Sequence, residues 1–132
     1  MKSLTLGKRI EDKTAHICVL GLGYVGLPLA VGLAEAGYKV TGLDVDETRV
    51  KAIQEGRSYI LDVAAQDIDK LVTSKQLWAT TDYDILAEVD VVFICVPTPF
   101  DAMKAPDLSA VVAAAIGIAK RLRPGQLIIL QS

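Results

Sequence analysis

The 132-residue chain is poor in the side chains that most catalytic and metal sites require, with one histidine and two widely separated cysteines. These residues do not make a ligand set, so no metal site is expected. The net charge is −2, aromatic residues make up 5%, and there is no basic block, which argues against a nucleic-acid partner. No apolar run approaches the roughly 18 residues that a membrane-spanning helix needs, so no membrane association is expected.

The scarce thiols offer no nucleophile. Cys18 and Cys95 both lie within strand-like apolar runs, and His16 opens the first of those runs. We interpret the thiols as small buried side chains in a reducing cytoplasm, because neither has a neighbouring base. The opening segment Met1–Arg9 is too polar for a secretory signal. We therefore predict a cytoplasmic location and no catalytic residue in this chain.

Apolar residues, in contrast, are abundant: they make up 52% of the chain, and the mean hydropathy is +0.38. Such a surplus is expected when helices cover both faces of a sheet. Apolar, β-branched segments alternate with helical patterns. This predicts an α/β fold, a doubly wound parallel sheet of Rossmann type with about five strands in the order 3-2-1-4-5. The expected strands are 16–20, 39–43, 78–81, 91–96 and 127–130, and the expected helices are 24–36, 47–54, 63–73, one turn at 84–88, and a helix from the Asp107 cap to Leu122.

One domain of residues 16–132 is expected, preceded by a charged lead-in of residues 1–15.

A glycine-rich turn opens this domain. The apolar run His16–Leu20 leads into Gly21-Leu22-Gly23-Tyr24-Val25-Gly26, where a Leu- and Ala-rich helical pattern begins. A strand, a tight glycine turn and a helix N-terminus in this order can hold a dinucleotide pyrophosphate on backbone amides. The triplet alone is a weak signal, and an ordinary glycine turn in an unrelated α/β protein is the alternative.

A carboxylate supports the dinucleotide interpretation. Asp44 ends the second predicted strand, 44 − 26 = 18 residues after Gly26. The acid that accepts hydrogen bonds from an adenosine ribose is expected about 20 residues on. Because a carboxylate there repels a 2′-phosphate, we predict NAD rather than NADP as the cofactor. The carboxyl ends of the strands should bring three loops into one crevice, namely 21–26, 44–49 and 97–100.

Together, several motifs resemble the N-terminal NAD-binding domain of the UDP-glucose/GDP-mannose dehydrogenase family, and most of all its UDP-N-acetylhexosamine (UDP-N-acetylglucosamine) 6-dehydrogenases. The similarity covers about residues 16–132. The motifs are Gly21-Leu22-Gly23-Tyr24-Val25-Gly26-Leu27-Pro28, Gly42-Leu43-Asp44-Val45-Asp46 with Arg49-Val50, Cys95-Val96-Pro97-Thr98-Pro99, and Pro106-Asp107-Leu108-Ser109.

The resemblance implies the roles of individual residues. Residues Gly21 to Gly26 (Gly21, Leu22, Gly23, Tyr24, Val25 and Gly26) would hold the pyrophosphate, and Asp44 would hold the adenosine ribose. Arg49 would lie beside the adenosine half, although it could also be a solvated charge on its helix. Thr98, in the segment Val96-Pro97-Thr98, would hydrogen-bond near the nicotinamide, although it could also serve only its own turn.

The resemblance also implies an activity in polysaccharide biosynthesis. Family enzymes oxidise the C6 alcohol of a nucleotide sugar to a carboxylate in two NAD-dependent steps, and the substrate here would be a UDP-sugar. The central segment and C-terminal catalytic domain of such enzymes are absent from these 132 residues. We therefore expect a fragment that binds NAD without catalysing a reaction.

Two other functions remain open: a stand-alone NAD-sensing regulatory module, and a β-hydroxyacid-type dehydrogenase. Three positions also depart from the family pattern, which often has glutamate there: Leu61, Ala105 and Gln131.

The final apolar strand 127–130 should form an exposed sheet edge, and such edges invite pairing. Dimerisation or aggregation through that edge is therefore predicted, and a homodimer is the partner expected.

Overall fold

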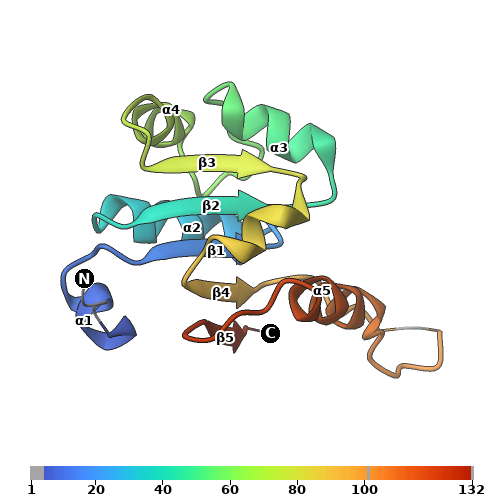
Figure 1. The fold of residues 1–132 in the computed structure, drawn as a ribbon. Helices are drawn as coiled ribbons and strands as arrows, with labels where there is room; N and C mark the ends of the chain where they lie inside the picture. The colour runs from blue at the N-terminus through green and yellow to red at the C-terminus, as the bar shows by residue number, and fades with distance from the viewer. Residues whose placement is uncertain (1–4, 101, 132) are drawn as a thin grey trace.

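The computed structural model describes residues 5–100 and 102–131. The first four residues of the predicted lead-in, and Ser132 at the end of the predicted domain, lie outside these ranges. All five strands form one parallel sheet in the order β3-β2-β1-β4-β5 (Figure 1). The strands are β1 (His16–Leu20), β2 (Lys39–Leu43), β3 (Leu77–Thr80), β4 (Val91–Ile94) and β5 (Leu127–Leu130). The predicted fold class and strand order are confirmed.

Alternating side chains of the strands build a core on each face of the sheet. In β1, Ile17 and Val19 join one apolar cluster, whereas Cys18 and Leu20 join the other. This is the two-sided burial expected of a central parallel strand. The first cluster is covered by α2 (Gly26–Glu35), α3 (Glu47–Gln54) and α4 (Ala65–Thr73), and the second by the 3₁₀ helix η1 (Tyr83–Ala87) and α5 (Ser109–Ala119).

Helix boundaries differ from the predicted ones where local contacts override the pattern. Helix α2 begins at Gly26 rather than Tyr24, because Tyr24 and Val25 remain in the exposed turn. Helix α5 begins at Ser109, with Leu108 and not the predicted Asp107 at the N-cap position. The Asp107 carboxylate lies one residue earlier and accepts a hydrogen bond from the Ser109 amide at 3.0 Å.

The other differences occur at the ends of elements. Strand β4 ends at Ile94, two residues early, because its neighbour β1 turns away at the glycine loop. Helix α5 ends at Ala119 instead of near Leu122, and the Arg121 guanidinium donates to the Gly117 carbonyl at 3.0 Å. Helix α4 starts two residues late, and β3 and η1 each lie one residue before their predicted positions.

The lead-in contains a short helix, α1 (Leu6–Glu11), that contacts the sheet through an ion pair. The Arg9 guanidinium donates to both oxygens of Asp90 at 2.6 and 2.8 Å, and the amide of His16 donates to the same carboxylate at 2.8 Å. Asp90 is only 3% exposed and also contacts Arg123 at 3.3 Å. Although burial raises the pKa of Asp90, these hydrogen bonds outweigh it and lower the pKa.

Candidate functional site

The glycine turn after β1 is packed so closely that two of its glycines have no room for a side chain. Gly21 has a φ of +99°, and a Cβ there would lie 2.7 Å from the Cys95 carbonyl oxygen. A Cβ at Gly26 would overlap the carbonyl oxygen of Gly21. The loop between β1 and α2 is therefore held between its own backbone and the end of β4, as the sequence predicts for a tight turn.

Gly23 differs from these two glycines in an informative way. It has no positive φ, and a Cβ there would meet no protein atom nearer than Arg49 Nη1, at 3.7 Å. Packing within the chain therefore does not require glycine at this position. The helix α2 that follows has no side-chain cap at Val25. Its Leu27 amide already donates to the Gly23 carbonyl at 3.0 Å, and Pro28 has no amide hydrogen. Gly23 thus leaves an open approach to the turn that leads into α2, where the amides of residues 24–26 donate to no backbone carbonyl of the described residues. Free amides at the start of a helix are an arrangement that binds an anion.

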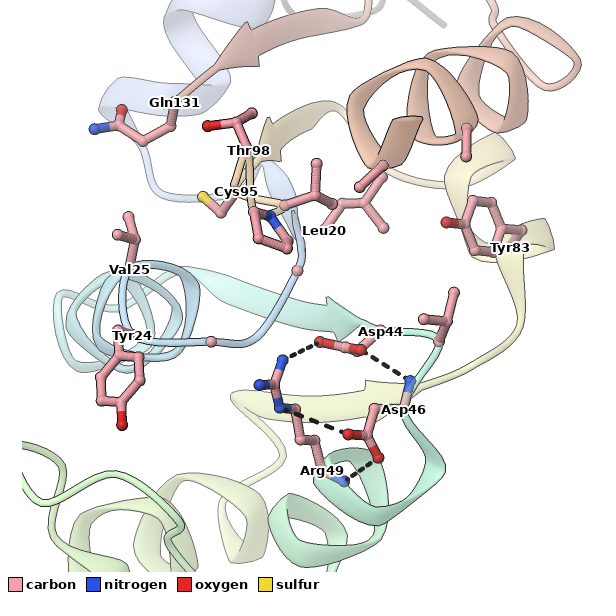
Figure 2. A pocket seen from close by; sticks show the side chains of 17 residues that line it. Leu20, Tyr24, Val25, Asp44, Asp46, Arg49, Tyr83, Cys95, Thr98 and Gln131 are labelled. Atoms are coloured by element: carbon pink, nitrogen blue, oxygen red, sulfur yellow. Dashed lines mark hydrogen bonds and ion pairs between the residues drawn. The ribbon is translucent and has the colours of Figure 1, made fainter. Parts of the chain in front are cut away.

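The Asp44 carboxylate, 5% exposed, joins the glycine turn to the loop after β2. Its Oδ2 accepts from the Leu22 amide at 2.8 Å, and its Oδ1 accepts from the Asp46 amide at 2.9 Å. Arg49 Nη1 lies 3.5 Å from Oδ2 (Figure 2). A carboxylate oxygen has more than one acceptor direction, so Asp44 retains capacity for hydroxyl donors from a ligand.

Three groups lie close to the guanidinium of Arg49. Its guanidinium lies 3.5 Å from Asp44, 3.8 Å from Asp46, and 5.8 Å from the centre of the Tyr59 ring. Asp46 also caps α3, because its carboxylate accepts from the Thr48 amide at 2.9 Å. Arg49 thus has two carboxylates and an aromatic ring as neighbours, and its side chain is 40% exposed.

A cavity of about 670 Å³ lies between these loops. Nine of the predicted site residues line it: Gly21, Gly23, Tyr24, Val25, Asp44, Arg49, Val96, Pro97 and Thr98. The expected convergence of the three loops on one crevice is thereby confirmed. Leu22 and Gly26 do not line the cavity. The Leu22 side chain is buried in the position that a Cβ on Gly42 would occupy, so Leu22 faces the site with its backbone alone.

The two ends of the cavity carry different chemistry. Figure 2 shows the charged residues Asp44, Asp46 and Arg49 together on one side, while Thr98 and Gln131 lie across the glycine turn from them. Gln131 is one of the three departures from the family pattern, and its backbone N–H donates to the Ile94 carbonyl at 2.9 Å. The other two departures, Leu61 and Ala105, are exposed and do not line this cavity.

Some lining residues have no recognisable signal in the sequence. Tyr83 contributes its phenol from η1, and its ring packs where a Cβ on Gly117 would lie. Burial, followed by the charge of Asp44, raises the pKa of Tyr83, so the phenol is a neutral donor near neutral pH. Ala110 and Ala113 of α5 complete this wall. Because Tyr83 reaches the site only through the sheet topology, its neighbours along the chain do not reveal it.

Neither cysteine has the character of a nucleophile. Cys18 is fully buried, and burial raises the pKa of its thiol to about 12. Cys95 lines the cavity but is 8% exposed, and burial raises its pKa as well. Both thiols are therefore protonated near neutral pH. Within the described residues, no cluster of three or more potential metal ligands is present, and no helix is long and apolar enough to span a membrane.

Comparison with known proteins agrees with this geometry. The model of the UDP-glucose/GDP-mannose dehydrogenase family NAD-binding domain matches residues 15–132. A UDP-N-acetyl-D-mannosamine dehydrogenase of Methanococcus aeolicus is 41% identical over 98% of the chain. An NDP-N-acetyl-D-galactosaminuronic acid dehydrogenase of Ralstonia nicotianae is 42% identical over 96%.

Solved structures show the same similarity. The structure of a UDP-D-ManNAc dehydrogenase from Pyrococcus horikoshii superposes with a TM-score of 0.83 at 34% identity. The superposition covers 89% of this chain and 28% of that one. The chain likewise spans about 30% of the length of the two relatives from Methanococcus and Ralstonia.

Proposed function

The chain belongs to the UDP-glucose/GDP-mannose dehydrogenase family and forms its NAD-binding domain, and on this premise we propose that it is the cofactor half of a nucleotide-sugar 6-dehydrogenase. The observation that carries the proposal is the contrast among the glycines. Gly21 and Gly26 are required by packing, whereas Gly23 is not and faces the cavity. A bound pyrophosphate approaching the backbone supplies the missing reason for glycine there.

The adenosine half of NAD would lie at the charged end of the cavity. Asp44 would accept hydrogen bonds from the ribose hydroxyls with the acceptor capacity that Leu22 and Asp46 leave free. Arg49 would lie beside the same half, above Gly23. The amides of the turn that leads into α2 would receive the pyrophosphate, with Tyr24 and Val25 forming the outer side of the turn.

The nicotinamide half would extend toward Val96, Pro97 and Thr98, where the Thr98 hydroxyl is available as a polar contact. NAD supplies a hydride acceptor when it is bound there. The chain's own residues bind and orient the cofactor. Since both thiols are buried and protonated, the catalytic nucleophile would come from protein outside these residues. The chain alone would bind NAD and turn over no substrate.

The substrate proposed for the whole enzyme is a UDP-N-acetylhexosamine, oxidised at C6 to the carboxylate. Relatives that are 41% and 42% identical are dehydrogenases named for N-acetylated sugars, and this supports the choice. We also propose a cytoplasmic location, with which the two free cysteines agree, because cytosolic thiols remain reduced.

A second copy of the chain is the partner proposed for the edge of the sheet. Strand β5 is an edge strand, and Leu127 and Leu130 are 40% and 58% exposed. Pairing of two β5 strands would satisfy the open backbone groups of each. Sedimentation should show a dimer that Leu130→Lys dissociates, and a concentrated monomer would refute the proposal.

The function is tested with the product of the full reading frame that encodes this chain. Purified protein is supplied with NAD and with UDP-N-acetylmannosamine, UDP-glucose or a small hydroxyacid, and NADH formation is followed by absorbance. The proposal expects NADH only with a UDP-sugar, and fastest with the N-acetylated one. NADH formed only with hydroxyacids would favour the β-hydroxyacid-type alternative. A protein that binds NAD and oxidises none of the three would favour the sensing module.

A further inference from the structure

Tyr59, in the connection between α3 and α4, makes a hydrogen bond to the glycine turn. Its hydroxyl donates to the Leu22 carbonyl at 2.6 Å, across 37 residues of sequence. The backbone amide of Leu22 donates to the Asp44 carboxylate at 2.8 Å, and the Leu22 side chain is fully buried. Leu22 is thus held on both sides of its backbone, by Asp44 through the N–H and by Tyr59 through the C=O.

The ring of Tyr59 contacts a second component of the site. The guanidinium carbon of Arg49 lies 5.8 Å from the ring centre, within the range of a cation–π interaction. Arg49 is 40% exposed and its two carboxylate contacts are 3.5 and 3.8 Å long, so neither fixes the side chain tightly. The aromatic ring provides the surface that keeps the guanidinium over the turn.

Tyr59 is a neutral donor under all physiological conditions. Burial raises its pKa, with the positive charge of Arg49 acting in the opposite direction. The hydroxyl therefore keeps its proton and its bond to the Leu22 carbonyl. Tyr59 does not line the cavity itself. Any effect on a ligand must therefore pass through Leu22 and Arg49.

We propose that Tyr59 is a positioning residue for the adenosine half of the cofactor, setting the glycine turn through Leu22 and the guanidinium through Arg49. This inference rests on the proposed function. It assigns to the α3–α4 connection a part in cofactor binding that the glycine motif and Asp44 do not explain. Because the effect is confined to the charged end of the cavity, it should be felt equally by NAD and by ADP-ribose, which lacks the nicotinamide.

The chain offers a matched control in Tyr38. Its hydroxyl also donates to a backbone carbonyl, that of Ile10, at 2.7 Å, and it is likewise part-buried, but it does not line the cavity. Tyr59→Phe and Tyr38→Phe each remove one phenol–carbonyl hydrogen bond and keep the ring. The two variants should lose similar stability in thermal unfolding, so a difference in ligand affinity between them reports position and not general weakening.

Calorimetric titration of the wild type and both variants with NAD and with ADP-ribose tests the inference. We expect Tyr59→Phe to weaken both ligands by the same factor, about three- to tenfold, the effect of one hydrogen bond. Tyr38→Phe should leave both affinities unchanged, and Tyr59→Leu should weaken them further through loss of the ring. Unchanged affinity in Tyr59→Phe, equal weakening in Tyr38→Phe, or a loss seen with NAD alone would overturn the positioning role. A wild type that binds neither ligand would instead refute the proposed function, and the inference with it.

Discussion

Asp44 should stabilise the fold even when no cofactor is present, and Asp44→Asn tests this. The carboxylate is 5% exposed and accepts two backbone hydrogen bonds, at 2.8 and 2.9 Å, from Leu22 and Asp46. Asparagine has one acceptor oxygen, so its NH₂ group must face one of these two N–H donors. One charge-assisted bond is lost, and one buried donor is left unpaired, at a combined cost of about 2–4 kcal/mol.

Urea denaturation without cofactor measures this loss directly, and thermal unfolding should show a fall in Tm of roughly 10 °C for a domain of this size. Asp82→Asn is the matched control. Asp82 follows β3 as Asp44 follows β2, but it is exposed and accepts from the Asp84 amide at 2.9 Å as a cap. Asparagine caps well, so the control should stay within about 0.5 kcal/mol of wild type. An Asp44→Asn variant as stable as that control would refute the structural role of the carboxylate.

Three other perturbations give expected outcomes. Gly26→Ala should lower the free energy of unfolding in urea by about 1–3 kcal/mol, because the added Cβ overlaps the Gly21 carbonyl. Gly32→Ala is the control, since a Cβ there has open space, and it should be neutral or stabilising. Equal effects of the two variants would contradict the packing argument. Because the pKa of Asp90 is lower in the folded state, its contribution to stability is complete above the free value of 3.8 and is lost as the pH falls below it. Acid denaturation should therefore be less steep in Asp90→Asn, and an unchanged pH dependence would count against the ion pair. Cys18 is fully buried, and burial raises the pKa of its thiol, so the native protein should resist alkylation that labels Cys18 readily in urea. Rapid labelling of the native protein would show that the thiol is not buried.

The sequence predicted the parts of this molecule that depend on local pattern. Strands β1, β2 and β5 and helix α3 have the predicted bounds. Gly37 and Gly56, which lie just beyond α2 and α3, have φ values of +109° and +73°, a conformation that favours glycine after a helix. The crevice was also predictable, because strand order alone determines which loops meet at the carboxyl edge of a parallel sheet.

Contacts between distant segments were not predictable from one sequence. The hydroxyl of Tyr59 bonds to a backbone carbonyl 37 residues away, and every residue offers such a carbonyl. Arg9 and Asp90 are 81 residues apart, in a chain with 14 basic and 16 acidic side chains, so no local pattern pairs them. The early end of β4 has a similar origin, since Val96 continues the apolar run but its neighbouring strand has already turned away.

The most direct test of the central claim is a calorimetric titration of the 132-residue chain with NAD and NADP side by side. A buried carboxylate at Asp44 and an open glycine turn at Gly23 predict saturable binding of NAD and much weaker binding of NADP. Binding of neither dinucleotide, or of NADP as tightly as NAD, would contradict the assignment of this cavity.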